Sequence, residues 1–191
     1  MYSQNKEEFY IKRYFKGFRG RLLDIGAYDG KTYSNSLALL LSGWYGELIE
    51  PSPEVYKLLA NNMRGLQVKI GNFGIGTKDG TCTFYDNTNA VATTVQKETV
   101  KWVKEKFTET TIQVRKFDTV WPNARFDFIT IDTEGLDWEI LQQIDIDKVG
   151  CRCVCIEYNL DKVLLAKYKE YFEKYNMKLV YTSAENVIYV K

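Results

Sequence analysis

The sequence has no histidine at all and only four cysteines among its 191 residues. The absence of histidine excludes a Ser-His-Asp triad, a Cys-His pair and any histidine-ligated zinc or iron site. Acid–base chemistry must therefore use carboxylates, lysine, tyrosine or cysteine. Neither sign of charge is in large excess, because the chain has 26 Lys and Arg residues and 25 Asp and Glu residues. We therefore expect neither a nucleic-acid partner nor a membrane partner.

Long hydrophobic runs are missing as well. The longest run, Leu37–Leu41, is far too short to cross a bilayer. The N-terminal stretch MYSQNKEEFYIKRYF mixes acidic and basic residues without an apolar centre, so it does not resemble a signal peptide. We expect a soluble protein of the cytoplasm.

The few cysteines indicate packing rather than chemistry. Cys151, Cys153 and Cys155 alternate with other residues in CRCVC, and Cys82 stands alone. On a strand, alternate residues share one face and lie about 6.6–6.8 Å apart, so these thiols neither converge on a metal nor form an easy disulfide. We expect buried, reduced thiols that pack as small hydrophobic side chains.

Hydrophobic residues make up 45% of the chain, which is enough for the core of one α/β domain. Strands and amphipathic helices alternate, as is typical of the first half of a doubly wound sheet. Ser52 and Pro53 form a helix-start signature, a hydroxyl at the N-cap followed by proline. The predicted elements are a helix within residues 1–19, a strand ending at Asp24, a helix over about Thr32–Ser42, a strand ending at Glu50, a helix whose buried stripe is Val55, Leu58, Leu59 and Met63, and a strand over Leu66–Ile70.

The second half continues the alternation after a less regular middle. FDFITID is predicted to be a buried strand ending at Asp132, and CRCVCIEYN a strand ending near Glu157. We expect a single domain over residues 1–191, with an N-terminal helical extension (1–19) and a catalytic core (21–191). The remaining predicted elements are strands in TCTFY and TTIQVR, a helix over Val100–Phe107, a helix carrying Leu136, Trp138, Ile140 and Leu141, a helix from Asp161 to Tyr175 with Val163, Leu164, Tyr168, Tyr171 and Phe172 on one side, and a hairpin of KLVYT and VIYV.

Lys101, Lys104 and Lys106 give the helix expected over Val100–Phe107 a basic face. That face could bind a phosphate-bearing acceptor, although a solvated helix face is the favoured interpretation. The polar stretch DNTNAVATT before it is expected to be a loop that either contacts the acceptor or cofactor or simply turns.

Acidic residues follow the ends of the predicted strands. In an open α/β sheet, ligands bind outside the carboxyl ends of the strands, where the strand order reverses. One solvated acid at a strand end is common, but several at one edge indicate a site. These residues are Asp24, Glu50, Asp132, Glu134 and Glu157.

Two cofactors fit a nucleotide-binding turn with an acid one strand later. A dinucleotide requires G-x-G-x-x-G, but the middle glycine is missing between Gly26 and Gly30. A pyrophosphate would also meet uncompensated negative charge beside Asp24 and Asp29. S-adenosylmethionine carries a net positive charge that suits these acids, and N–H groups of the following helix can take its carboxylate. Glu50 can then accept both ribose hydroxyls, although the segment could also be a plain strand–turn–helix bend.

Several blocks together resemble the FkbM-type S-adenosylmethionine-dependent methyltransferases, over about Arg21–Lys191. The resemblance implies a Rossmann-like seven-stranded methyltransferase sheet, mostly parallel with an antiparallel strand in a C-terminal hairpin, and helices on both faces. It also implies methyl transfer, commonly to a hydroxyl of a sugar or another small molecule. The blocks, in the family's order, are DIGAYDGKTYSNS, GELIEPSPEVYKLL, FDFITIDTEGLDWEIL, CVCIEYN and NVIYV.

The resemblance also implies roles for residues. Asp24, Gly26 and Gly30 would line the methionine end of S-adenosylmethionine, and Glu50 would bind the ribose. Asp132 and Glu134 would lie near the transferred methyl group. With their neighbours, the predicted cofactor-binding residues are Asp24, Gly26, Ala27, Asp29, Gly30, Glu50 and Pro51, and the predicted catalytic residues are Asp132, Glu134 and Glu157.

The activating group is left open by the sequence. A sugar hydroxyl is a poor nucleophile, so either a carboxylate base or a bound divalent metal ion would help, and no metal is specifically indicated. Asp132 could instead cap the helix that starts near Leu136. Two other functions also stay open: a nicotinamide-type nucleotide enzyme on the same fold, and a non-catalytic methyltransferase-like module that binds a partner.

Overall fold

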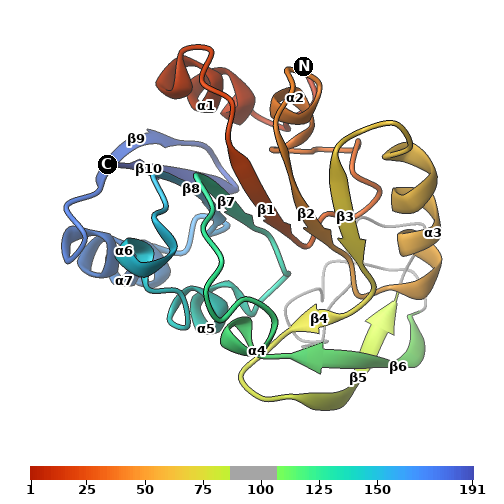
Figure 1. The fold of residues 1–191 in the computed structure, drawn as a ribbon. Coiled ribbons are helices and arrows are strands. Elements are labelled where there is room, and N and C mark those ends of the chain that lie inside the picture. Colours follow the sequence, from red (N-terminus) through yellow and green to blue (C-terminus); the bar gives the residue numbers. More distant parts are fainter. Residues whose placement is uncertain (87–106) are drawn as a thin grey trace.

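A seven-stranded sheet forms the centre of the computed structural model, which describes residues 1–86 and 107–191 (Figure 1). The strands are β1 (Arg21–Ile25), β2 (Tyr45–Ile49), β3 (Val68–Gly71), β7 (Phe128–Ile131), β8 (Cys153–Glu157), β9 (Lys178–Thr182) and β10 (Asn186–Val190). Their order is β3-β2-β1-β7-β8-β10-β9. The first five pair in parallel, and β10 is inserted antiparallel between β8 and β9. The predicted sheet and its C-terminal hairpin are therefore confirmed.

Helices cover both faces of this sheet, as predicted (Figure 1). One face carries α1 (Glu7–Phe15), α2 (Leu37–Leu40) and α3 (Pro53–Asn62). The other carries α4 (Phe117–Val120), α5 (Asp137–Leu141), α6 (Ile146–Val149) and α7 (Lys162–Glu173). Neighbouring residues of a strand face opposite sides, so Leu22 packs toward α1 and α2 whereas Leu23 packs toward α5 and α6. Within the described ranges, no helix has both the length and the apolarity needed to cross a membrane.

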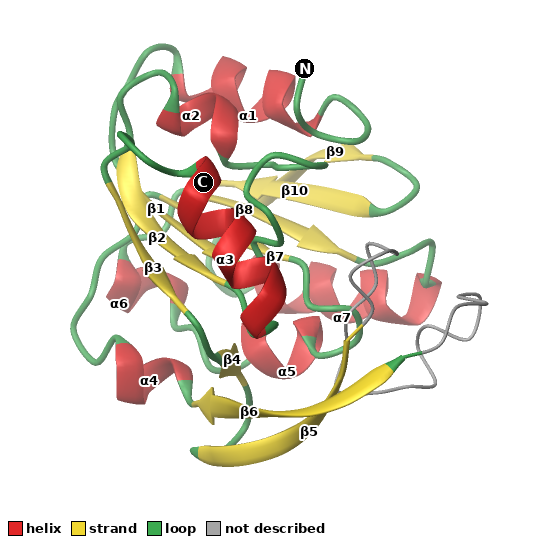
Figure 2. Cartoon of the chain, turned by 90° about the vertical axis from the view of Figure 1, so that its right-hand side faces the viewer, coloured by secondary structure: helices red, strands yellow, loops and turns green. Residues whose placement is uncertain are grey.

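A second, smaller sheet follows β3 in the chain. It contains β4 (Gly74–Ile75), β5 (Gly80–Asp86) and β6 (Thr108–Arg115) in the order β4-β6-β5, and it lies at the lower edge of the molecule in Figure 2. The strands expected in TCTFY and TTIQVR are confirmed, and they pair with each other antiparallel. The loop expected over DNTNAVATT and the basic helix expected over Val100–Phe107 lie outside the described residues, apart from Asp86 at the end of β5 and Phe107.

The helix expected over Thr32–Ser42 is much shorter, because α2 has only four residues. Serine side chains compete with helical hydrogen bonding in the preceding segment, where Leu37 N donates to Ser34 Oγ at 3.0 Å and Ser36 Oγ donates to Asp24 Oδ2. The N–H of Leu37 is therefore used within this segment, and binding of a ligand carboxylate by the N–H groups of the helix stays a prediction.

The start of α3 is confirmed. Ser52 Oγ accepts the N–H of Val55 at 3.2 Å, and Pro53 occupies the first turn. The assignment of Leu58 to the buried stripe of α3 is wrong, because this residue is 54% exposed. In α7, Tyr168, Tyr171 and Phe172 are buried, whereas Val163 is 67% exposed. Both helices lie at the surface, where only part of an apolar stripe reaches the core.

The cysteines are free thiols, and Cys151, Cys153 and Cys155 are buried, as predicted. Cys153 and Cys155 pack on the α1–α2 face, while Cys151, which precedes β8, packs on the opposite face. Burial raises the pKa of the Cys151 thiol to about 12. These thiols act as small hydrophobic side chains.

We expect Asp161→Ala to lower the free energy of unfolding by about 0.5–2 kcal/mol. The Asp161 carboxylate accepts the N–H groups of Val163 (2.8 Å) and Leu164 (3.0 Å) and so caps α7. Chemical denaturation measures the loss. Asp161→Asn is the matched control, because asparagine caps helices as well as aspartate, and an equal loss in both variants would contradict the capping role.

Candidate active site

The ends of four parallel strands bring the predicted site residues to one edge of the sheet. Ile25 pairs with Ile49 of β2 and with Ile131 of β7. Ile131 in turn pairs with Ile156 of β8. The residues that follow these positions, Gly26, Glu50, Asp132 and Glu157, therefore lie in a row at the carboxyl edge, where α/β folds bind ligands.

A cavity of about 720 Å³ opens at this edge. Its size is within the usual range for cofactor sites. Asp29 and Gly30 do not line the cavity, whereas the other predicted site residues do: Asp24, Gly26, Ala27, Glu50, Pro51, Asp132, Glu134 and Glu157.

Gly26 is required by the close approach of two backbone segments. Its φ is +87°, and a Cβ at this position would lie 1.7 Å from the carbonyl oxygen of Asp132. Its N–H and that of Ala27 both donate to the carbonyl of Ile49 at 3.0 Å. The turn after β1 is thereby fixed between β2 and β7.

Asp29 and Gly30 shape this turn from outside the cavity. Asp29 Oδ1 accepts the N–H groups of Lys31 (2.8 Å) and Thr32 (2.7 Å). Gly30 has φ +73° and lies against Leu59 of α3. Both positions are explained by local structure.

The Glu50 carboxylate is held by backbone donors at the end of β2. Oε1 accepts the N–H of Ser52 at 2.7 Å, and Oε2 accepts that of Tyr28 at 3.0 Å. Burial raises the pKa of Glu50 to about 8 despite these two hydrogen bonds, and the charge of nearby Asp86 contributes. Asp86, which was not identified from the sequence, is buried at the end of β5 and accepts the Ser52 hydroxyl.

Asp24 is buried at the end of β1 and accepts the hydroxyl of Ser36 through Oδ2. Burial raises its pKa to about 6, and the hydrogen bond from Ser36 opposes that rise. Asp24 and Glu50 therefore place two desolvated carboxyl groups on neighbouring strands, where a donor or a positive charge would be stabilised.

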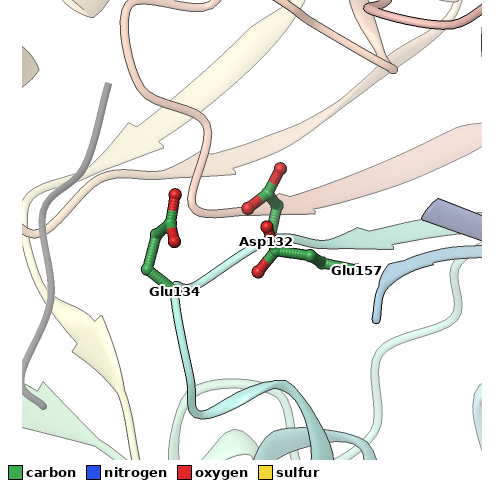
Figure 3. A group of neighbouring side chains, drawn as sticks. All are labelled: Asp132, Glu134 and Glu157. Carbon is green, nitrogen blue, oxygen red and sulfur yellow. The ribbon is translucent and has the colours of Figure 1, made fainter. Parts of the chain in front are cut away.

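Three more carboxyl groups gather at the ends of β7 and β8, as Figure 3 shows. One oxygen each from Asp132, Glu134 and Glu157 lies within 4.8 Å of the others. Burial, together with the charges of neighbouring acids, raises the pKa of Asp132 and Glu157. Burial and the charge of Asp137 raise the pKa of Glu134 to about 7. Such a cluster binds protons more readily than isolated carboxyl groups do, and its oxygen ligands also suit a hard divalent cation.

Asp137 organises the turn that carries this cluster, and this residue was not identified from the sequence. Its carboxylate accepts the N–H groups of Thr133 (2.9 Å) and Gly135 (3.2 Å), while Glu134 between them has φ +53°. The interpretation of Asp132 as the cap of the following helix is wrong, because the N-cap of α5 is Leu136, with no side-chain cap among the described residues. Asp137 could have been found in the sequence as an acidic residue in the first turn of the predicted helix, where such residues bind free N–H groups.

The family model for the methyltransferase FkbM domain matches residues 24–179. No curated protein matches the sequence.

Solved structures share the fold. Methyltransferase FkbM from Methylobacillus flagellatus KT aligns with a TM-score of 0.65 at 14% identity, covering 99% of this chain and 48% of that one. This chain therefore spans about half the length of that relative. Precorrin-6y C5,15-methyltransferase from Geobacter metallireducens GS-15 aligns with a TM-score of 0.53 at 12% identity, covering 95% and 86%. The N-terminally shortened METTL16 methyltransferase domain gives 0.54 at 13%, covering 96% and 79%.

Proposed function

The chain belongs to the FkbM methyltransferase family, and on this premise we propose that it methylates a hydroxyl group of a small molecule, such as a sugar, with S-adenosylmethionine as the methyl donor. The observation that carries the proposal is the pair of buried carboxyl groups, Asp24 and Glu50, at the ends of adjacent strands in the main cavity. Their charge suits a ligand that is cationic at one end and a diol at the other.

The residues present fit this cofactor. Glu50 would accept the ribose hydroxyls through the lone pairs that the backbone donors leave available, and Asp24 would face the ammonium group. Beyond Glu50 the cavity wall becomes apolar, with Ile49, Phe73 and Phe84 among its lining residues. This part suits the flat adenine ring.

The chain's own groups would supply positioning and proton transfer. When bound, S-adenosylmethionine supplies a methyl group already activated by a sulfonium. Asp132 would accept the proton of the acceptor hydroxyl, since burial and neighbouring acids raise its pKa and so make its carboxylate a stronger base. Glu134 and Glu157 would share the proton within the cluster. A divalent cation held by the same three oxygens is the alternative means of lowering the hydroxyl's pKa.

The two rival functions have less support. A dinucleotide would place its pyrophosphate beside Asp24 in a cavity where Lys78 is the one basic residue among the described lining. A non-catalytic module would have no need of an accessible cavity lined by three clustered carboxyl groups.

S-adenosylhomocysteine should raise the melting temperature of the protein, while NAD should not. At a ligand concentration 100 times the dissociation constant, binding to the folded state adds about 2.7 kcal/mol of stability. Differential scanning fluorimetry with both ligands measures the shifts. Equal shifts from both ligands, or none from either, would refute the cofactor assignment.

A further inference from the structure

The N-terminal residues are fixed against the β9–β10 turn. The Asn5 side-chain amide donates to the Glu185 carboxylate, and the Tyr181 hydroxyl donates to the Asn5 carbonyl. Glu7, which is fully buried, accepts the Ser183 hydroxyl at 2.9 Å. These contacts join the two ends of the chain, so the segment before α1 has a defined position beside the sheet.

This anchored segment borders the active-site cavity. Gln4 lines it, and the adjacent Ser3 forms a parallel bridge with Tyr33, which also lines it. Glu185 lines it too, and its carbonyl accepts the N–H of Asn159 at 3.1 Å. Five lining residues come from these joined segments, and we call them the acceptor wall: Gln4, Tyr33, Asn35, Asn159 and Glu185.

The acceptor wall ends at the acidic cluster. The Asn159 side chain hydrogen-bonds to Glu157, one of the three clustered carboxyl groups. The charge of Glu7, at the start of α1, contributes to the raised pKa of Asp132. A molecule lying along this wall would therefore reach the cluster, whereas the apolar lining beyond Glu50 belongs to another part of the cavity.

Asn35 supplies an unsatisfied recognition group on this wall. It is 7% exposed, and its Oδ1 is buried without a hydrogen-bond partner among the described residues. A buried carbonyl oxygen is costly to leave unpaired, so its partner is expected to arrive with a ligand. A hydroxyl group supplies the donor that Oδ1 lacks.

The charges around the cavity limit what can lie on the wall. Seven acidic side chains and one basic side chain, Lys78, belong to its described lining. A phosphate or carboxylate would be repelled here, and Lys78 comes from the segment between β4 and β5, which contributes no residue to the wall. These charges act against an anionic acceptor and do not act against an amine.

We propose that the acceptor wall is the acceptor-binding subsite and that Gln4 and Asn35 determine its specificity for a hydroxyl-bearing molecule without a phosphate or carboxylate group. This inference rests on the methyl-transfer function proposed above. It gives the N-terminal extension a role in selecting the acceptor, in addition to its packing on the sheet.

Side-chain amide signals in ¹⁵N NMR test the proposal directly. Protein saturated with S-adenosylhomocysteine is titrated with neutral methyl hexosides, with hexose phosphates and with amino sugars. We expect the methyl hexosides to shift the Asn35 and Gln4 amide signals, and the amides of exposed Asn61 and Gln67 to stay unmoved. Shifts confined to other residues, no shift with any neutral sugar, or tighter binding of the phosphates than of the methyl hexosides would overturn the proposal.

Variants separate this subsite from the cofactor site. Asn35→Ala should weaken binding of the best methyl hexoside about tenfold, because a lost hydrogen bond worth about 1.4 kcal/mol corresponds to a factor of ten in affinity. The affinity for S-adenosylhomocysteine should stay unchanged. Gln4→Ala tests the same wall at an exposed position, where folding is not at risk, and Asn61→Ala and Gln67→Ala are matched controls. An equal loss of S-adenosylhomocysteine affinity in Asn35→Ala would assign that residue to the cofactor and overturn its role here. Failure of the wild type to bind S-adenosylhomocysteine would instead refute the proposed function.

Discussion

Asp132→Asn should reduce turnover by about 10²–10⁴-fold and leave the affinity for S-adenosylhomocysteine near the wild-type value. Asp132 follows the buried strand β7, and its carboxyl group lies with those of Glu134 and Glu157. With no histidine in the chain, these groups are the leading candidates to accept the proton of a hydroxyl. Asparagine keeps the shape of the side chain but cannot take up a proton. Initial rates with any acceptor that the wild type methylates, together with calorimetry, measure both quantities.

The stability of Asp132→Asn distinguishes catalysis from structure. Asp137, and not Asp132, holds the N–H groups of the turn before α5. The free energy of unfolding should therefore change little, because the substitution removes no hydrogen bond that supports the turn. Asp118→Asn in the first turn of α4, at an exposed position, is the matched control for an Asp to Asn change. A variant that methylates at the wild-type rate would remove Asp132 from the proposed catalytic residues.

The parallel strands of the main sheet could be predicted because each short apolar run ends in an acidic residue or a glycine turn. Parallel strands meet at one edge, so the acids after β1, β2, β7 and β8 could be placed together before the structure was known. The prediction holds for Asp24, Glu50, Asp132, Glu134 and Glu157, all of which line one cavity.

Elements that depend on long-range pairing could not be predicted in the same way. β5 pairs with β6 across a long intervening segment, and nothing local in Gly80–Asp86 indicates that this strand leaves the main sheet. A helix was predicted over Thr32–Ser42, but the hydroxyls of Ser34 and Ser36 form hydrogen bonds that keep the segment before Leu37 from becoming helical.

The residues of the acceptor wall could not be predicted from the local sequence either. Gln4 and Glu185 lie at opposite ends of the sequence, and they line one cavity because β10 is inserted beside β8 and because Asn5 contacts the hairpin turn. Asn35 carries no recognisable signal, since an unpaired buried amide is evident only once its neighbours are known.

Glu50→Ala should weaken binding of S-adenosylhomocysteine by at least about tenfold. Hydrogen bonds from hydroxyls to a carboxylate are worth about 1.5–3 kcal/mol each, and about 1.4 kcal/mol corresponds to one decade in affinity. Calorimetry measures the dissociation constant, and Glu54→Ala, an exposed acid in the first turn of α3, is the matched control. Unchanged affinity in Glu50→Ala would mean that the ribose lies elsewhere.

The pH dependence of binding tests the same carboxylate independently. The pKa of Glu50 is raised from 4.5 to about 8 in the ligand-free fold, so its ionised fraction falls from about one half at pH 8 to about one hundredth at pH 6. Because ribose hydroxyls favour the ionised form, affinity for S-adenosylhomocysteine should fall about tenfold or more over that interval. The ligand-free protein should show the opposite trend: the folded state holds this proton more tightly than the unfolded chain, so Glu50's contribution to stability is present below pH 4.5 and is lost as the pH rises toward 8. Glu50→Gln cannot titrate and should flatten both profiles, and an affinity profile identical to that of the wild type would assign the pH dependence to another group.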